Sequence, residues 1–382
     1  MKLIISTLVS LLFTGAFLSA QMPGMMTMQK ASAPQGTTLG ANTTSGAAGI
    51  ALGNRVVMRG YVDFKYGYQT KSDNPVPGTT VAGPDKSDFT TKSDIDFLFD
   101  FSPVTGEVHL AMNPNPDTNE EQIGLEQAFA RYSFNRDFHI TFGRQLTSLS
   151  FEDDESPGLY SVTSSYALAT EKLKNIVDDI TGLGYTNLRA KLNAHQNYND
   201  GVRANFNNGR FGFILGLYDG YWTGEDFDTD NVGIDVAASF MIVPGLEYRI
   251  GYAHNGVTLM HATNPRIEDT ITQFNTWISY NPGALTLTLE YDKYDNMGFD
   301  ISDVMLLANY QFSDFFAASV RYVYEDVQTG ISSGADSDRL TLAVLLSITQ
   351  NFGLNLEYSH WAVNAENDYS VNEFYIQGLL SF

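Results

Sequence analysis

The sequence contains no cysteine and few basic residues. Without cysteine there can be no disulfide framework, no thiolate metal site and no cysteine nucleophile. Lys and Arg number 22 against 44 Asp and Glu, so the formal net charge is −22 over 382 residues. Such a balance argues against nucleic acid as a partner, because phosphates would be repelled. After the first twenty residues no run of 18 apolar residues occurs, so no membrane-spanning helix is expected.

The N-terminal residues predict export from the cytoplasm. Residues 1–20 combine Lys2, an apolar run and a small-residue ending at Ala20, which is typical of a secretory signal peptide. Residues 21–54 are rich in Gly, Ala, Thr and Ser and lack periodicity, so we expect a disordered lead-in. The methionines within 22–28 raise the alternative of a copper(I) site. An incidental Met-rich tail is the favoured interpretation, and no cofactor is predicted.

The body of the chain, 55–382, has a recurrent period of two. In 339–348 apolar side chains alternate with a mostly polar set, and the same pattern recurs in 94–101, 246–253 and 285–292. Such alternation indicates β-strands with one apolar and one polar face. A soluble β-sandwich alternates in the same way, so the connections must decide between the two architectures.

The connections fall into two classes. Seven are short and rich in Gly, Pro, Asn and Asp: 103–106, 135–137, 207–209, 243–245, 281–283, 313–314 and 350–351. Eight are longer and polar: 71–90, 113–123, 150–200, 219–230, 256–269, 295–300, 328–337 and 365–370. Together they would join about 16 strands, with 14 or 18 as alternatives because 186–200 is ambiguous. Within and beside it, 185–192 could be a short extra strand or the return of the loop. The sequence therefore predicts an all-β fold, a transmembrane antiparallel up-and-down β-barrel.

Aromatic residues support a barrel in a lipid bilayer. Phenylalanines such as Phe134, Phe211 and Phe312 gather at the short turns, whereas tyrosines such as Tyr218 and Tyr252 lie toward the long loops. Two aromatic girdles are typical of transmembrane barrels. The chain also ends on a strand that closes with phenylalanine, as the insertion signals of bacterial outer-membrane proteins do.

Three short segments carry a family resemblance. Glu126–Tyr132 followed by Thr141–Gln145, and then Ser164–Tyr166, resemble the OmpL-like β-barrel porin family. Arg144 stands where a lysine is common in that family. The resemblance implies a channel-forming protein of the outer membrane in a Gram-negative-type envelope, and it fixes no substrate.

A barrel of this size would enclose water, and its inward residues would line a pore. Acids outnumber bases on the predicted inward face, so we expect passive diffusion of small hydrophilic solutes or ions with a preference for cations. The candidate pore-lining and constriction residues are Asp94, Asp96, Asp100, Glu107, Arg131, Arg203, Glu247, Arg249, Glu290, Asp292, Arg321, Glu152, Asp153, Asp154 and Glu155.

The third long loop, 150–200, is expected to fold toward the lumen and constrict it opposite the wall arginines. Its residues 166–180 have helical apolar spacing. An outer lid is the alternative interpretation. The acidic run 152–155 lacks the spacing of a calcium loop, so a solvated charge run is favoured and no metal is predicted.

Two other functional classes remain open. No motif of a serine hydrolase, a zinc protease or a phosphate-binding loop occurs, so no enzyme is predicted. An acid–base dyad of His254 or His261 with Glu268 or Asp269 is the weaker hydrolase alternative. Adhesion or a structural role through the long loops is the other. The expected partners are outer-membrane lipid and, by analogy with 16-strand porins, two further copies of the chain in a homotrimer.

Overall fold

The computed structural model describes residues 36–40, 49–71, 85–115, 120–152, 156–165, 185–186, 198–221, 232–261, 267–296, 299–329, 334–364 and 368–382. These residues form 18 strands, of which β1 (Ile50–Ala51) and β7 (Tyr185–Thr186) have two residues each. No helix among them is long and apolar enough to cross a membrane.

Removing β1 and β7 from the 18 strands leaves sixteen long ones. They are β2 (Val56–Lys71), β3 (Lys86–Phe101), β4 (Val104–Asn115), β5 (Glu120–Ser133), β6 (Phe138–Leu146), β8 (Tyr198–Asn207), β9 (Phe211–Tyr218), β10 (Gly233–Val243), β11 (Leu246–His261), β12 (Ile267–Tyr280), β13 (Leu285–Asn296), β14 (Phe299–Gln311), β15 (Phe316–Thr329), β16 (Ala335–Ser347), β17 (Phe352–Asn364) and β18 (Tyr369–Ser381).

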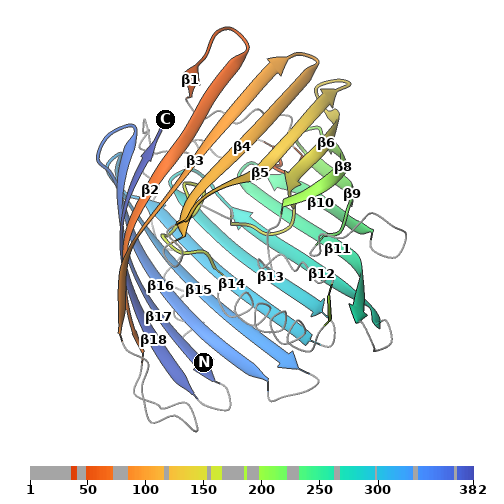
Figure 1. The fold of residues 1–382 in the computed structure, drawn as a ribbon. Coiled ribbons are helices and arrows are strands. Elements are labelled where there is room, and N and C mark those ends of the chain that lie inside the picture. Colours follow the sequence, from red (N-terminus) through yellow and green to blue (C-terminus); the bar gives the residue numbers. More distant parts are fainter. Residues whose placement is uncertain are drawn as a thin grey trace.

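The sixteen strands close into a ring (Figure 1). Each pairs antiparallel with the next long strand in the chain, and β18 pairs with β2 from Val371↔Lys71 to Ser381↔Tyr61. Gly60 and Phe382 extend this seam through two backbone hydrogen bonds of 2.9 and 3.0 Å. No long strand keeps an open edge, so the backbone polar groups of the wall are satisfied within the ring. The predicted antiparallel barrel of 16 strands is confirmed.

All seven predicted short turns join neighbouring strands at one end of the barrel, the end marked C in Figure 1. The predicted long loops were too long. Only 262–266 separate β11 from β12, whereas 256–269 were expected to be loop, and only 297–298 separate β13 from β14. Backbone pairing continues here through residues such as Glu268 and Asp269. The sequence pattern misses these extensions because consecutive polar residues such as Glu268, Asp269 and Thr270 interrupt the alternation.

The ambiguous segment 185–192 does not add a strand to the ring. Its described residues, Tyr185 and Thr186, form β7, which pairs with Met260 and His261 at the long-loop end of β11. Residues 187–192 lie outside the described residues.

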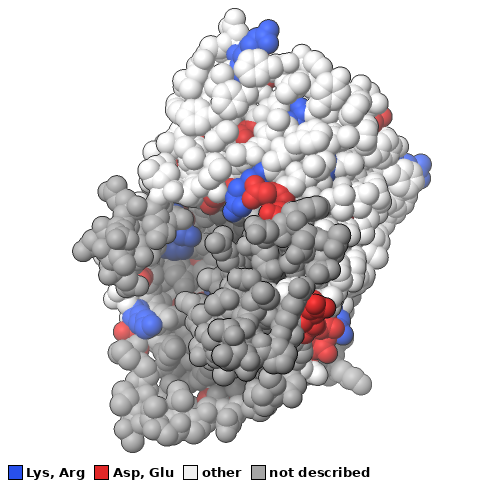
Figure 2. Space-filling view, turned by 45° about the vertical axis from the view of Figure 1, so that its right-hand side comes forward, with Lys and Arg blue, Asp and Glu red and all other residues white. Residues whose placement is uncertain are grey.

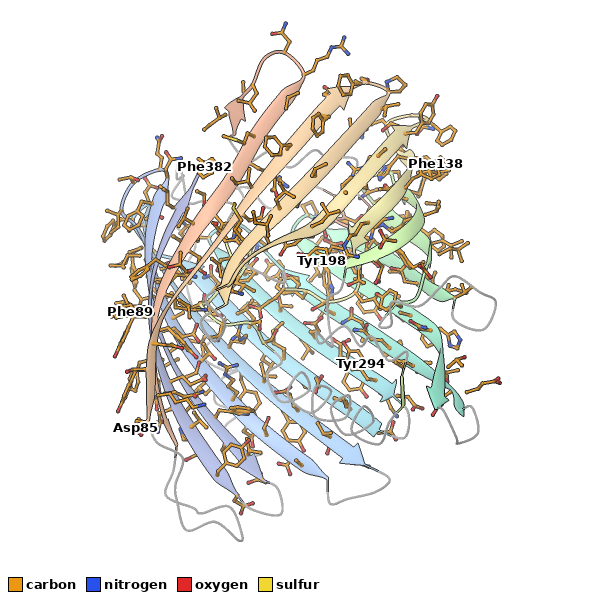
Figure 3. All side chains as sticks on the ribbon, viewed as in Figure 1. Asp85, Phe89, Phe138, Tyr198, Tyr294 and Phe382 are labelled. Atoms are coloured by element: carbon orange, nitrogen blue, oxygen red, sulfur yellow. The ribbon has the colours of Figure 1, made fainter. Side chains whose placement is uncertain are left out.

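The two faces of the wall have opposite chemistry. On β16 the outward Leu340 and Leu342 are 41% and 44% exposed, whereas the inward Arg339 and Thr341 are 3% and 1% exposed. Charged side chains are sparse on the outer wall in Figure 2, and Phe89, 69% exposed, points away from the barrel in Figure 3. Apolar groups outside and polar groups inside invert the order of a soluble domain and fit a wall surrounded by hydrocarbon.

The aromatic pattern is largely as expected. Phe134, Phe211 and Phe312 are exposed around the short turns, and Phe138 and Phe382 lie at the same end of the barrel in Figure 3. Tyr252 is exposed toward the long-loop end, at 44%.

Tyr218 is an exception, because its place in the expected girdle was wrong. It is 1% exposed and shares the inward face of β9, where its hydroxyl donates to Asp235 at 3.2 Å.

The outward face generates a prediction about depth. Leu342 is outward in mid-strand, so Leu342→Arg should lower the free energy of unfolding by about 2–4 kcal/mol, because a charge would enter hydrocarbon. Phe352→Arg, outward beside a short turn, is the matched control and should cost about 0–1 kcal/mol. Denaturant unfolding of protein refolded into lipid vesicles measures both. An equal loss of unfolding free energy in the two variants would contradict the inference that Leu342 faces the hydrocarbon core.

Candidate functional site

The inward face carries most of the predicted pore-lining residues. Buried on the inner wall are Asp94 on β3, Glu107 on β4, Glu247 and Arg249 on β11, Glu290 and Asp292 on β13, and Arg321 on β15. Asp96, Arg131 and Arg203 are half-buried on the same face. Period-two alternation explains why these residues share one face, because successive side chains of a strand point to opposite faces.

Of the other predicted candidates, Asp100 does not line the lumen, and three lie outside the described residues. Asp100 is exposed at the short-turn rim, where one carboxylate oxygen accepts the amide of Ser102 at 3.0 Å. It follows the same alternation as Asp96, but it lies beyond the enclosed part of the wall. The acidic residues Asp153, Asp154 and Glu155 fall outside the described residues.

One cluster of charges joins β2, β3 and β4. Arg59 donates from Nε to Asp96 at 2.6 Å, and its Nη2 lies 3.5 Å from Glu107. His109 lies between the same two carboxylates, 3.1 Å from Asp96 and 3.0 Å from Glu107. Arg59 and His109 were not predicted as site residues, although both fall on inward positions of the alternation.

A second group forms an acidic wall across β13, β14 and β15. Asp292 lies in register with Asp303, which lies in register with Glu325, and Glu290 is two residues from Asp292 on the same face. All four are 0% exposed. Asn275 donates to Glu290 at 2.8 Å and to Asp292 at 2.7 Å, so neighbouring amides stabilise these carboxylates.

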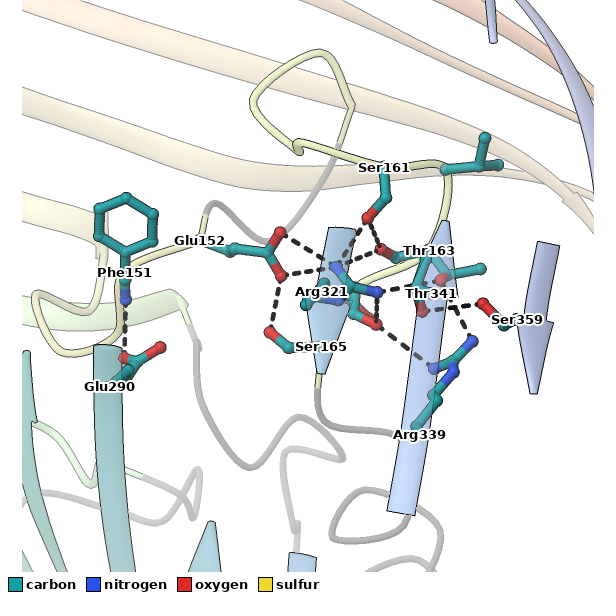
Figure 4. A network of polar contacts seen from close by, with 12 residues as sticks. Phe151, Glu152, Ser161, Thr163, Ser165, Glu290, Arg321, Arg339, Thr341 and Ser359 are labelled. Carbon is teal, nitrogen blue, oxygen red and sulfur yellow. Dashed lines mark hydrogen bonds and ion pairs between the residues drawn. The ribbon is translucent and has the colours of Figure 1, made fainter. Parts of the chain in front are cut away.

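The third long connection is attached to the far inner wall through Arg321 (Figure 4). Arg321 Nη1 donates to both oxygens of Glu152 at 3.0 and 2.8 Å and to Ser161 Oγ at 2.7 Å. The two charged side chains are 0% and 2% exposed. Arg321 was expected to stand opposite the loop as a pore charge, but it binds the loop directly. Because the buried charges are paired, their desolvation is offset.

Further strands hold the same connection. Glu357 on β17 accepts the amide and the hydroxyl of Thr163 at 3.0 and 2.6 Å. Arg339 on β16 donates to Thr163 Oγ1 at 3.1 Å and to Glu373 at 2.6 Å. Glu290 accepts the amide of Phe151 at 2.8 Å. The described parts of the loop, 147–152 and 156–165, therefore contact inward residues of β13 and β15–β17. The expected helix at 166–180 lies outside the described residues.

A cavity of about 540 Å³ remains between this loop and the short-turn end of the wall. Arg131, Arg203 and Arg249 line it, with Glu247 and Trp277. Its remaining lining includes Thr38–Gly40, His139, Leu146–Phe151, Tyr160 and Asn281. Here basic side chains outnumber acidic ones, the reverse of the acidic wall.

Register and local contacts explain how the arginines are held. Arg131 and Arg203 flank Thr141 on adjacent strands. Arg203 donates to the carbonyl of Leu146 at 2.8 Å. The guanidinium carbon of Arg249 lies 4.5 Å from the ring centroid of Trp277, a cation–π contact.

The lead-in is part of the site, contrary to expectation. Residues 36–40 and 49–54 of the predicted disordered segment 21–54 have described positions, and 36–40 contact the inner wall. Residues 36–40 have neither periodicity nor charge, so nothing in their sequence predicts this contact. Residues 1–35 lie outside the described part of the chain.

Strand pairing does not bring His254 opposite either acid of the proposed dyad. His254 lies in register with Thr272 rather than with Glu268 or Asp269. Within the described ranges no group of three or more His, Asp or Glu is placed to hold a metal ion.

The Arg321 network generates a stability prediction. Arg321→Leu should lower the free energy of unfolding by about 3–5 kcal/mol, because Glu152 would stay buried without its cation. Adding Glu152→Gln in the same chain should recover part of the loss. Arg136→Leu, at a side chain 91% exposed, is the control and should change stability by less than about 0.5 kcal/mol. Urea titration of the protein in vesicles measures the free energy of unfolding. If Arg321→Leu lowers it no more than Arg136→Leu does, Arg321 and Glu152 do not form a buried ion pair.

Comparisons with known proteins were made for sequence and for structure. No protein-family model and no curated protein matches the chain. Similar solved structures include the outer membrane channel DcaP of Acinetobacter baumannii, with 14% identity, a TM-score of 0.61, and coverage of 86% of this chain and 97% of that one. An anion-selective porin from Comamonas acidovorans has 13% identity, a TM-score of 0.56, and coverage of 86% and 99%. OmpT of Vibrio cholerae in its trimer form has 14% identity, a TM-score of 0.54, and coverage of 86% and 100%. The chain therefore has the barrel fold of the outer-membrane porins.

Proposed function

We propose that the protein is an outer-membrane porin that lets small hydrophilic solutes or ions diffuse passively. The observation that carries this proposal is the closed ring of sixteen strands whose inward row is polar and charged while its outward row is apolar. Barrels of this strand number leave an aqueous channel. The names of the similar structures, which include a channel and a porin, support the same function.

The location and assembly form part of the proposal. A signal peptide at 1–20 would direct export, and the motifs around Arg131 and Arg144 resemble the OmpL-like porins. A homotrimer is supported by the trimer form of one similar structure.

For selectivity we favour a preference for cations. The inward arginines Arg59, Arg321 and Arg339 each face a carboxylate within 3 Å. The acidic wall adds four carboxylates, Glu290, Asp292, Asp303 and Glu325, on the inward face of three adjacent strands. An excess of buried negative charge lowers the energy of a cation in the lumen. Anion preference is the second candidate, because Arg131, Arg203 and Arg249 line the cavity and one similar structure is named an anion-selective porin.

We also propose that loop 150–200 sets the constriction. Its described parts contact inward residues of β13 and β15–β17 through Phe151, Glu152 and Thr163, far from the strands β6 and β8 that the loop joins. A segment that crosses from one side of a pore to the other narrows it, and the cavity beside it is the room that remains.

Selectivity can be tested by changing charge of each sign separately. Under a salt gradient in planar bilayers, the reversal potential should indicate cation preference. Asp303→Asn with Glu325→Gln should weaken that preference, and Arg131→Gln with Arg203→Gln should strengthen it, because each pair removes two charges of one sign. An unmodified pore that prefers anions would reverse the assignment in favour of the arginine-lined cavity.

The constriction can be tested by shortening the loop. Deletion of 155–190 should raise single-channel conductance, because it removes the attachments of Thr163 to the wall. Deletion of 73–83 from the connection between β2 and β3 is the control and should leave conductance unchanged. Equal conductance in the two deletions would reject the constriction.

The alternatives have their own outcomes. If purified, folded protein forms no channel in bilayers, the porin proposal fails, and adhesion or hydrolase assays become the appropriate next measurement.

A further inference from the structure

Five residues that precede the barrel in the chain lie inside it, at its short-turn end. Gly36–Gly40, here called the strap, contacts β8, β9 and β11. The amide of Thr37 donates to the carbonyl of Gly209 at 2.9 Å. The side-chain amide of Asn207 donates to the carbonyls of Thr37 and Leu39 at 2.8 and 2.9 Å.

The central contact of the strap is with two predicted pore-lining residues. The amide of Thr38 donates to Glu247 at 3.1 Å, and its hydroxyl donates to the same carboxylate. Arg249 Nη2 donates to the Thr38 hydroxyl oxygen at 2.6 Å. Glu247 and Arg249 are 5% and 9% exposed. The strap thus occupies hydrogen-bonding groups that a solute in the pore would otherwise meet.

Glycines on the wall make room for the strap. A Cβ added to Gly212, on the inward face of β9, would lie 2.6 Å from the hydroxyl oxygen of Ser239 on the neighbouring strand β10. It would also lie 2.7 Å from the carbonyl oxygen of Leu39 and 2.8 Å from the hydroxyl oxygen of Thr37 in the strap. A Cβ on Gly36 would lie 2.7 Å from the carbonyl oxygen of Gly209. Leu39, 3% exposed, packs in one apolar cluster with Ile214. The wall is therefore shaped to receive this segment.

The N-terminal segment is attached to opposite sides of the barrel. Its later part, β1, pairs with β2 through Ile50↔Met58 and Ala51↔Val57. β11 stands eight places from β2 in the ring of sixteen long strands. The chain therefore binds the wall at two places that face each other across the short-turn mouth.

We propose that Gly36–Gly40 is a displaceable strap that partly closes the short-turn end of the pore and covers Glu247 and Arg249. The strap carries no charge, buries one large apolar side chain and otherwise relies on hydrogen bonds that water can replace. Segments with so few buried contacts open without unfolding the rest of the molecule. This inference rests on the proposed porin function.

The absence of cysteine allows the strap to be locked in the full-length chain. Gly40 has a φ of +62°, at which a cysteine is strained, and a Cβ built there would lie 3.3 Å from Cβ of Asn205, slightly less than the usual disulfide separation of about 3.5–4.5 Å. In Gly40→Cys with Asn205→Cys, oxidation should hold the strap in place and lower single-channel conductance roughly twofold relative to the reduced protein, because the pore cross-section is reduced. Each single substitution is a control and should not respond to reductant.

Equal conductance of the fully oxidised and fully reduced double variant would overturn the proposal, since the strap would then not control the pore. If the disulfide does not form, the thiol-labelling measurement described next decides whether the strap is docked. If no variant conducts in any state, the porin function fails instead.

A second measurement does not depend on conductance. Thr37 is 5% exposed, so Thr37→Cys should react slowly with a membrane-impermeant thiol reagent. Adding Gly212→Ala should speed the reaction about tenfold, because the new methyl group occupies the place of the strap. Gly353→Ala is the matched control, since a Cβ there meets nothing closer than 3.5 Å, and it should leave the rate unchanged. Equal rates with Gly212→Ala and Gly353→Ala would refute the docking.

Discussion

Satisfaction of backbone hydrogen bonds without water is the constraint on which this molecule depends. A sheet in hydrocarbon cannot leave an edge open, so β18 must return to β2 and sixteen strands must share one continuous register. Closure in turn fixes the two faces. Apolar side chains such as Leu342 face outward, and the charged ones have only the interior left to occupy. The buried polar network is thus a consequence of barrel closure. The loop 150–200 and the strap bind to charged side chains that closure has placed on the inner face, such as Arg321 and Glu247.

The sequence predicted the wall well because the wall is a local pattern. Alternation assigns each residue to a face, and Gly, Pro, Asn and Asp mark the turns, so strand number and inward residues follow from neighbours in the chain. The errors occurred where the pattern weakens. Strand ends near Glu268 and Asp269 are polar on both faces and were taken for loop. Tyr218 was assigned to a girdle by its residue type, although its place in the alternation points it inward.

The site was less predictable because its contacts are not local. Glu152 and Arg321 are 169 positions apart, and Thr38 and Glu247 are 209 apart. No spacing rule joins such residues. Glu152 was a candidate because it belongs to the acidic run 152–155. Nothing in that run distinguishes Glu152, which pairs with Arg321, from the three acids that follow it. Similarly, the composition of 21–54 predicts disorder for the segment as a whole. It cannot predict that Gly36–Gly40 docks on the wall, because that docking depends on the space beside Gly212, which is far away in the sequence.

The seam between β2 and β18 has a consequence for biogenesis. The strand that completes the ring is the last of the sixteen in chain order, so β2 lacks its second neighbour until all the other long strands have been made. Stepwise folding from the N-terminus therefore cannot close the ring. An incomplete barrel exposes both an unpaired strand edge and an apolar outer face, which favours association between copies.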